Sequence, residues 1–323
     1  MFALAALAAS ASFAQSSVTV FGIVDAAVRV ENGTVADKTS MVNSGYNTSR
    51  IGFRGVEDLG GGMKATFWLE GALANDDGNA TGLNFQRRSL VGLEGGFGKI
   101  ELGREYTPHF WNHTVYDPFG TNGAGTSAAL NTGSGGSTTV RTNNAINYVT
   151  PAFGGFTLQL QNAQGEAASN AAAPDAGNMT AARLAYAQGA LTFALASGKT
   201  NVSNGVDITS NNFGASYDLG VAKLMGAVVE DKKTGATTQK GSVVGLTAPL
   251  GAGTVRFAVS ETKAGAAKTA KTAIGYVYGL SKRTDLYTTY ANTKHSGGAG
   301  AADALAGANG KVNALEAGVK HSF

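Results

Sequence analysis

Two kinds of break divide this sequence, and their order constrains the fold more than any single motif does. After Gln15, apolar residues alternate with polar or small ones in short stretches, which is the period-two pattern of half-buried β-strands. Seven breaks are tight and rich in turn residues: Leu59–Gly62, Gly95–Gly98, Pro151–Gly155, Gln188–Gly189, Asp218–Gly220, Pro249–Gly253 and Leu280–Thr284. Eight breaks are long and polar: residues 31–46, 75–83, 105–140, 165–178, 199–209, 231–239, 263–270 and 294–310.

These fifteen connections predict sixteen antiparallel strands whose first and last members meet. Alternation of short and long connections is typical of an all-β transmembrane barrel of the outer-membrane type, and so many strands leave a water-filled lumen. The composition agrees, because mean hydropathy is −0.03 and no apolar run reaches the ~18 residues of a spanning helix. The alternative is a soluble all-β repeat protein, against which stands the aromatic last residue, Phe323.

The apolar N-terminus has the features of an export signal. Residues 1–14 have an Ala/Leu-rich core and end in small residues, as signal peptides do before the cleavage site. The cationic segment that normally opens such a signal is missing, so we expect the true translation start to lie a few codons upstream. We therefore assign 1–14 to a signal peptide and 15–323 to a single barrel in the bacterial outer membrane.

Charge and chemistry-bearing residues exclude several function classes. The 25 basic and 22 acidic residues leave a dispersed net charge of +3, which is too small to indicate a nucleic-acid partner. The absence of cysteine excludes disulfides and thiolate metal sites. His109 and His113 stand four residues apart, but the residues between them supply no third ligand or general base, so no metal is expected. The histidines fit no Ser-His-acid triad, so neither catalysis nor a cofactor is expected.

The third long stretch, Glu105 to Val140, is about twice the length of the other connections and has no sustained periodicity. Insertions of this length without secondary structure are usually functional. We expect this third loop to fold back into the lumen of the barrel. An exposed surface loop is the alternative.

Five arginines gather around this stretch in chain order, and Arg50, Arg87 or Arg88, and Arg141 are at the strand ends nearest the long loops. Arg50 and Arg54 share one face of the second strand, and Arg141 begins the sixth. Arg87 and Arg88 begin the fourth strand, and alternation leaves open which of the two faces the pore. Arginines held close together inside a hydrated pore attract anions and repel cations. The alternative is that they are merely solvated residues of the lumen.

Two acids of the same stretch, Glu105 and Asp117, are candidates to face these arginines across the pore. Opposed charges of this kind would set an electric field transverse to the channel. Other charged residues on polar strand faces are assigned to general lumen lining: Lys64, Glu70, Lys99 and Glu101.

Six segments resemble general diffusion porins of the Gram-negative outer membrane, of the β-proteobacterial branch: SSVTVFGIVDAAV, TSRIGFRGVEDLGGGMKATFWLE, FQRRSLVGLEGGFGKIELGR, NYVTPAFGGF, YGLSKRTDLY and GVKHSF. The resemblance implies a homotrimer of barrels, each narrowed by its third loop. It also implies an arginine cluster at the constriction, which maps onto Arg50, Arg87 and Arg141. Similarity to anion-selective members implies a preference for small anions.

The expected function is passive diffusion of small hydrophilic solutes and ions, with anions preferred, through a pore surrounded by outer-membrane lipid and lipopolysaccharide. The alternative is an outer-membrane barrel that acts mainly as an adhesin or structural protein, since outward loops always face partners. Planar-bilayer conductance separates the two, because an adhesin barrel with a plugged lumen would carry no large steady current.

Overall fold

The computed structural model describes residues 16–78, 84–130, 140–203 and 205–323, so the proposed signal peptide lies outside the described residues. The strands are β1 (Ser17–Gly33), β2 (Asp37–Asn43), β3 (Arg50–Gly60), β4 (Met63–Ala72), β5 (Arg88–Gly95), β6 (Gly98–Tyr106), β7 (Arg141–Val149), β8 (Phe156–Ala163), β9 (Met179–Gln188), β10 (Leu191–Ser203), β11 (Val206–Asp218), β12 (Lys223–Lys233), β13 (Gln239–Leu250), β14 (Gly253–Ala264), β15 (Ala267–Gly279), β16 (Thr284–Ser296) and β17 (Lys311–Ser322). A helix, α1 (Pro108–Val115), and a 3-10 turn, η1 (Ala128–Leu130), lie between β6 and β7.

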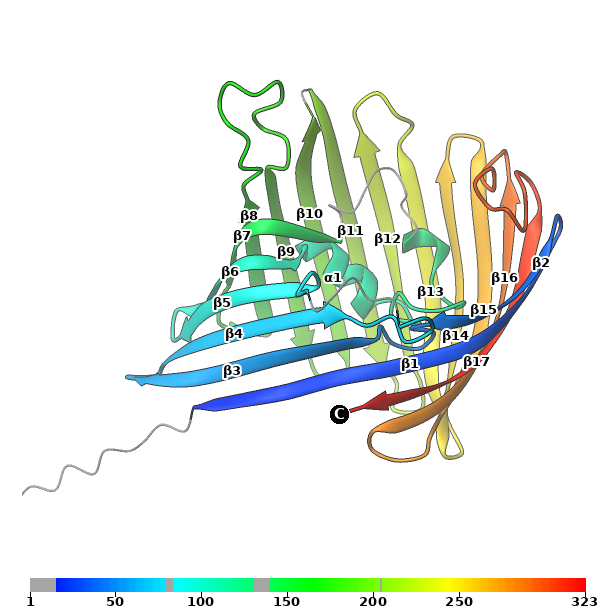
Figure 1. The fold of residues 1–323 in the computed structure, drawn as a ribbon, viewed down its shortest axis with the longest axis horizontal. Helices are drawn as coiled ribbons and strands as arrows, with labels where there is room; N and C mark the ends of the chain where they lie inside the picture. Colours follow the sequence, from blue (N-terminus) through cyan, green and yellow to red (C-terminus); the bar gives the residue numbers. More distant parts are fainter. Residues whose placement is uncertain (1–15, 79–83, 131–139, 204) are drawn as a thin grey trace, which may run out of the picture.

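The strands form one antiparallel sheet that closes on itself, because β1 pairs with β17 (Figure 1). Strands β2 and β3 both pair with β1, β2 along Ala26–Asn32 and β3 along Ser17–Ile23. They therefore share one position in the ring, interrupted at residues 44–49. The seventeen strands fill sixteen positions, which confirms the sixteen-stranded antiparallel barrel expected from the sequence.

The closing seam joins the two ends of the chain. Eleven register pairs run from Ile23↔Ser322 to Gly33↔Val312. Beyond them, the Gly22 N–H donates to the carbonyl oxygen of Phe323 at 3.0 Å and the Phe323 N–H donates to that of Gly22 at 3.1 Å. An unpaired backbone group in lipid costs several kcal/mol, so a closed ring is a stable way for strands to cross a membrane.

The outer and inner faces of the barrel differ in polarity. Exposed apolar side chains alternate along the strands, and register places Leu195 beside Phe213 and Phe213 beside Val228 in an outer belt. The intervening positions, such as Ala194 and Asn212, are buried or polar and face the lumen. This is the alternation expected for strands with lipid on one side and water on the other.

The tight turns lie at the predicted positions. Three of the predicted long loops, however, are wrong, because much of each forms a strand. Within 31–46, residues 37–43 form β2, and most of 199–209 and 263–270 belongs to the hairpins β10–β11 and β14–β15. The sequence shows no apolar alternation at these strand ends, because their residues are polar on both faces. A strand that continues above the lipid has water around it and needs no apolar face.

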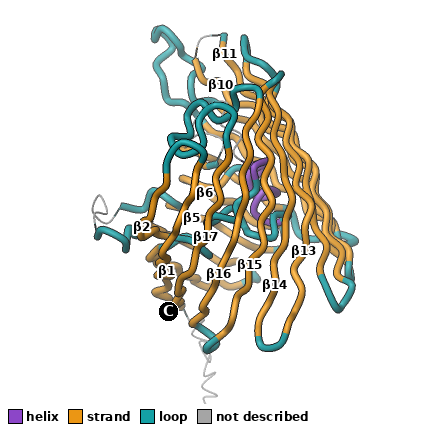
Figure 2. The backbone as a smooth tube through the Cα atoms, turned by 90° about the vertical axis from the view of Figure 1, so that its right-hand side faces the viewer, coloured by secondary structure: helices purple, strands orange, loops and turns teal. Residues whose placement is uncertain are grey.

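In the connection between β6 and β7, α1 is visible within the ring of strands (Figures 1 and 2). Helix α1 packs on β8–β11 and η1 packs on β12–β15. Residues 131–139 of this connection lie outside the described residues. Among the residues that are described, no helix is both long and apolar enough to cross a membrane.

Candidate functional site

The inner loop, which we define as residues 107–130, begins with a capped helix. The Thr107 side chain accepts a hydrogen bond from the Phe110 N–H at 3.4 Å, and Pro108, which lacks an N–H, opens the helix. Within α1, the Asn112 Nδ2 donates to the carbonyl of Ala194 at 3.1 Å and to Asn212 Oδ1 at 2.8 Å. The helix is thereby fixed to the lumen face of β10 and β11.

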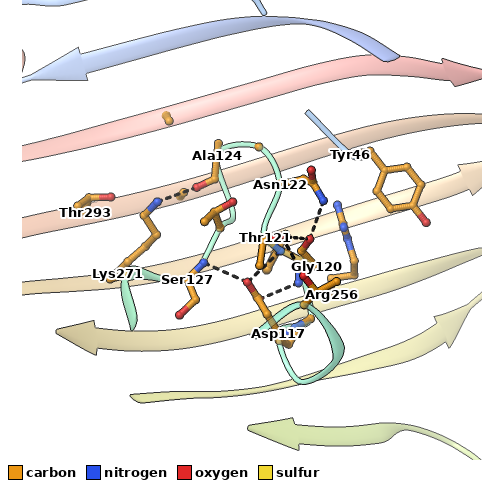
Figure 3. A pocket seen from close by; sticks show the side chains of 18 of the residues that line it. Tyr46, Asp117, Gly120, Thr121, Asn122, Ala124, Ser127, Arg256, Lys271 and Thr293 are labelled. Carbon is orange, nitrogen blue, oxygen red and sulfur yellow. Dashed lines mark hydrogen bonds between the residues drawn. The ribbon is translucent and has the colours of Figure 1, made fainter. Parts of the chain in front are cut away.

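A compact turn around Asp117 follows the helix. Its carboxylate accepts backbone N–H groups from Phe119 at 2.9 Å, Ser127 at 3.2 Å and Thr121 at 3.3 Å (Figure 3). Burial raises the pKa of the Asp117 carboxyl, while these three donors act in the opposite direction. The turn is therefore organised by one buried acid that binds the backbone of its own loop.

Glycines on the lumen face make room for the bulky residues of the inner loop. A Cβ at Gly214 of β11 would lie 2.1 Å from the Tyr116 ring, and one at Gly245 of β13 would lie 2.6 Å from the Pro118 ring. Tyr116 and Phe119 are almost fully buried. Close packing of this kind holds the loop against the wall in addition to the hydrogen bonds.

Charged side chains from distant strands hold the tip of the inner loop. The Ala124 N–H donates to Glu316 Oε1 of β17 at 3.4 Å. Lys271 Nζ of β15 donates to the Ala124 carbonyl at 3.1 Å (Figure 3). Arg29 Nε of β1 donates to the other oxygen of Glu316 at 2.8 Å. Both polar groups of one residue are thus bound by ionic side chains of the wall.

Arg256 of β14 lies between two aromatic rings. Its guanidinium carbon is 4.7 Å from the centre of the Tyr46 ring and 4.6 Å from that of Phe119. Its Nε and Nη2 have no hydrogen-bond partner among the described residues. Stacking of a cation on aromatic faces therefore links the inner loop to the segment that interrupts β2 and β3.

Three arginines converge on the wall that β3–β7 form; we call Arg50, Arg87 and Arg141 the arginine cluster. Arg87 Nε donates to Glu70 Oε1 at 2.6 Å, and Arg50 Nη1 lies 3.5 Å from the same oxygen. Arg87 Nη2 and Arg141 Nη2 donate to the Tyr106 hydroxyl at 2.6 and 2.7 Å. Glu70 and Tyr106 therefore tie the three guanidinium groups together.

The arginine cluster lines the main cavity of the lumen, which has a volume of about 2110 Å³. The inner loop contributes to this cavity the uncharged polar side chains of Thr114, Thr121 and Asn122 and the carboxylate of Asp117. With three guanidinium groups and one carboxylate, Glu70, this part of the wall carries two net positive charges. The arrangement produces a positive potential on one side of the passage.

Arg54 and Arg88 lie outside the arginine cluster. Arg88 Nε donates to Glu105 Oε2 at 3.1 Å, and its guanidinium lies 4.4 Å from the Trp68 ring. Arg54 lies 5.4 Å from the same ring. Arg88 lines a separate cavity of about 510 Å³, whereas Arg87 lines the main cavity.

The two candidate acids have partners other than the arginine cluster. Glu105 is at the end of β6 and binds Arg88, while Asp117 binds the backbone of the inner loop. Sequence reasoning did not assign Glu70 to the cluster. The strand pairing contains a signal for this contact. Glu70 is the register partner of Gly52, and Arg50 is two residues from Gly52 on the same face, so Glu70 and Arg50 lie close together.

His109 and His113 are both buried in α1, and the His109 carbonyl accepts a hydrogen bond from Asn212 Nδ2 at 2.9 Å. Within the described part of the chain, no group of three His, Cys, Asp or Glu side chains is arranged to hold a metal.

A closed barrel with an apolar outer belt, a polar lumen and an inner loop defines a transmembrane channel. The chain belongs to the Gram-negative porin family, which matches residues 2–298. It is 40% identical over 347 residues to outer membrane porin protein 32 of Delftia acidovorans, which covers 100% of this chain and 99% of that protein.

Solved structures show the same architecture. The anion-selective porin from Comamonas acidovorans superposes with a TM-score of 0.87 at 36% identity, covering 96% of this chain and 100% of that chain. A trimer form of OmpT from Vibrio cholerae shares the fold alone, with a TM-score of 0.69 at 14% identity over 95% of this chain and 99% of that chain.

The protein is an outer-membrane channel for passive diffusion, and a mainly adhesive or structural role is not favoured. Members of this family are channel proteins rather than enzymes.

Proposed function

We propose that this porin prefers small anions and that the arginine cluster sets the preference. The observation that carries the proposal is the pair of shared partners, Glu70 and Tyr106, which hold three guanidinium groups together beside the main cavity. The similarity to the anion-selective porin from Comamonas acidovorans supports it. Glu105 pairs with Arg88, and Asp117 accepts backbone N–H groups of its own loop, so neither acid pairs with the arginine cluster.

Coulomb's law gives the scale of the effect. One unit charge acting on an ion 4 Å away contributes about 1 kcal/mol in bulk water and about 4 kcal/mol at the effective dielectric near a protein surface. Two net positive charges therefore favour an anion over a cation by more than tenfold at the narrow part of the lumen, since 1.4 kcal/mol corresponds to about tenfold. Screening shortens this interaction, so the preference falls as salt rises toward 1 M.

The test is a reversal-potential measurement in a planar bilayer with a potassium chloride gradient. The triple variant Arg50→Gln, Arg87→Gln and Arg141→Gln should lose most of the anion preference, so that its chloride-to-potassium permeability ratio approaches one. Arg54→Gln is the matched control, because Arg54 lies outside the cluster, and its ratio should stay near the wild-type value. An unchanged reversal potential in the triple variant would show that the arginine cluster does not set the anion preference.

We further propose that phosphate and small dicarboxylates are among the solutes. Multivalent oxyanions gain more than chloride from several guanidinium groups, because guanidinium and carboxylate or phosphate oxygens match in geometry. Bi-ionic potentials with chloride on one side and phosphate or a dicarboxylate on the other rank the three permeabilities. Permeabilities that follow ionic size alone would contradict the proposal.

We also propose that three copies assemble into a homotrimer and that the apolar outer belt contacts outer-membrane lipid and lipopolysaccharide. The trimer form of the OmpT neighbour supports the first statement and the exposed apolar residues support the second. Sedimentation in mild detergent measures the oligomeric state.

N-terminal sequencing of the exported protein tests the signal peptide, with Gln15 expected as the first residue.

A further inference from the structure

A fully buried acid of the wall, Asp25 of β1, is held by three hydrogen-bond donors. Its Oδ1 accepts the hydroxyl of Tyr287 of β16 at 2.5 Å. Its Oδ2 accepts the backbone N–H groups of Tyr46 at 2.9 Å and Asn47 at 2.5 Å. The ion pairs between described residues do not include Asp25. Because a buried charge without a cationic partner is costly, these donors are what compensates the carboxylate.

The backbone of Asp25 binds the same part of the chain, residues 44–49, which we call the connecting segment because it joins β2 to β3. The Asp25 N–H donates to Ser49 Oγ at 3.0 Å. The Asp25 carbonyl accepts the Ser44 N–H at 2.9 Å and the Ser49 hydroxyl at 3.1 Å. Ser44 has a φ of 69°, a strained conformation that persists only where its surroundings fix it. Asp25 therefore holds both ends of the connecting segment.

The connecting segment in turn holds Arg50 of the arginine cluster. Arg50 Nε donates to the Thr48 carbonyl at 2.9 Å, and Arg50 Nη2 donates to Asn47 Oδ1. Asn47 is also one of the residues whose N–H binds the Asp25 carboxylate. The contact of Arg50 with Glu70 is longer, at 3.5 Å. The two shorter contacts of this guanidinium therefore come from a segment that Asp25 fixes.

We propose that Asp25 is a positioning residue for the anion preference, because it fixes the connecting segment and this segment fixes the Arg50 guanidinium within the arginine cluster. The inference rests on the proposed function, since it assigns a support to one of the three arginines. Arg50 and Arg87 carry like charges beside one carboxylate, Glu70, so an unsupported Arg50 would move away from Arg87.

The positioning role and a direct electrostatic role of Asp25 predict changes of opposite sign. If the Asp25 carboxylate acted on passing ions only through its own negative charge, its removal would raise the preference for anions. If it acts by holding Arg50, its removal lowers that preference, because a positive charge leaves the cluster. The direction of the change in selectivity therefore separates the two roles.

The test is the reversal potential of the full-length porin in a planar bilayer with a potassium chloride gradient. Asp25→Ala should lower the chloride-to-potassium permeability ratio roughly two- to fivefold, since doubling the distance between a charge and a passing ion halves their interaction. Asp25→Asn keeps an oxygen for the two N–H groups and an amide for the Tyr287 hydroxyl, so its ratio should be at or above the wild-type value. Glu31→Gln removes another carboxylate of β1 that lines the main cavity, and it should raise the ratio.

A double-mutant cycle locates the effect. In the Arg50→Gln background, Asp25→Ala should cause no further fall in the permeability ratio, because Asp25 acts through Arg50. Tyr287→Phe removes one donor to Asp25 and no charge, so it should lower the ratio by a smaller factor, and it replaces Asp25→Ala if that variant does not fold. Its matched control is Tyr290→Phe, which removes a hydroxyl from the exposed face of the same strand and should keep the wild-type ratio.

Three results would overturn the inference. The permeability ratio could rise or stay unchanged in Asp25→Ala. An equal fall in the Arg50→Gln background would assign the effect to another route, such as the inner loop, which the Thr48 hydroxyl contacts at Asn122 Oδ1 at 2.8 Å. An unchanged ratio in Arg50→Gln itself would overturn the proposed role of Arg50 as well. A lowered ratio in Arg50→Gln combined with a wild-type ratio in Asp25→Ala would overturn the positioning role alone.

Discussion

His113 lies in the last turn of α1 and is buried against the wall. Burial lowers the pKa of its imidazole from 6.5 to about 3, and the neighbouring His109 adds to the shift. In a released inner loop the His113 imidazole would take up a proton near pH 6.5. In the docked loop it takes up a proton only near pH 3. Docking therefore weakens as the pH falls through this interval and is independent of His113 above it. Asp117 acts in the opposite sense, because burial raises its pKa and acid relieves the desolvated carboxylate.

We predict that the channel closes and reopens more often at pH 4 than at pH 7.5, as measured in single-channel recordings. His113→Gln should lose most of this difference, because glutamine cannot take up the proton. His321→Gln, on β17 and away from the loop, should behave like the wild type. Equal acid sensitivity in His113→Gln and the wild type would show that other groups control the response.

At the scale of elements, the inner loop and the wall are fitted to each other. Gly214 of β11 leaves the space in which the Tyr116 ring lies, and Asn112 binds Asn212 two residues earlier on the same strand. An extra side chain in a packed interface typically costs about 1–3 kcal/mol. Small residues on the inner face of the wall therefore decide where the loop lies.

Gly214→Val should displace Tyr116 and detach part of the inner loop. We expect faster proteolysis of the loop in detergent and noisier open-channel current, while the barrel stays folded. Ala215→Val is the matched control, because the next residue on the strand points to the outer face and tolerates a larger apolar side chain. Wild-type proteolysis and current noise in Gly214→Val would show that the ring is not held there.

At the scale of the whole molecule, the barrel depends on its seam. The last residue completes it, because Phe323 exchanges two backbone hydrogen bonds with Gly22 and its ring covers that glycine. Each net hydrogen bond contributes about 1 kcal/mol. The seam at this end thus depends on one residue that no other strand can replace.

Removal of Phe323 should lower the free energy of unfolding of the refolded barrel by about 2 kcal/mol beyond the effect of Phe323→Ala, which keeps the backbone bonds. Urea-dependent unfolding in detergent, followed by tryptophan fluorescence, measures the difference. Refolding from urea avoids any effect of the C-terminus on cellular assembly. Equal stability of the deletion and Phe323→Ala would assign the contribution to the ring alone.

The sequence predicts the strands of the wall better than it predicts the contacts of the inner loop. Alternation and turn residues are local signals, so the number of strands and the shared face of Arg50 and Arg54 follow from them. Arg256, Lys271 and Glu316 hold a loop more than a hundred residues away in the chain, and no local pattern encodes that proximity. Arg87 and Arg88 are adjacent, and only the observed contacts of each side chain distinguish them.

The anchors of the inner loop have a consequence for assembly. Ala124 depends on Lys271 of β15 and Glu316 of β17, and the Ala128 N–H donates to Ser260 Oγ of β14 at 2.9 Å. Whatever the order in which strands insert, the loop has its full set of anchors only when the last strand is in place. An unfinished barrel would contain an unheld loop and a passage of undefined width. The inner loop therefore reaches its final position only when β17 has joined the wall.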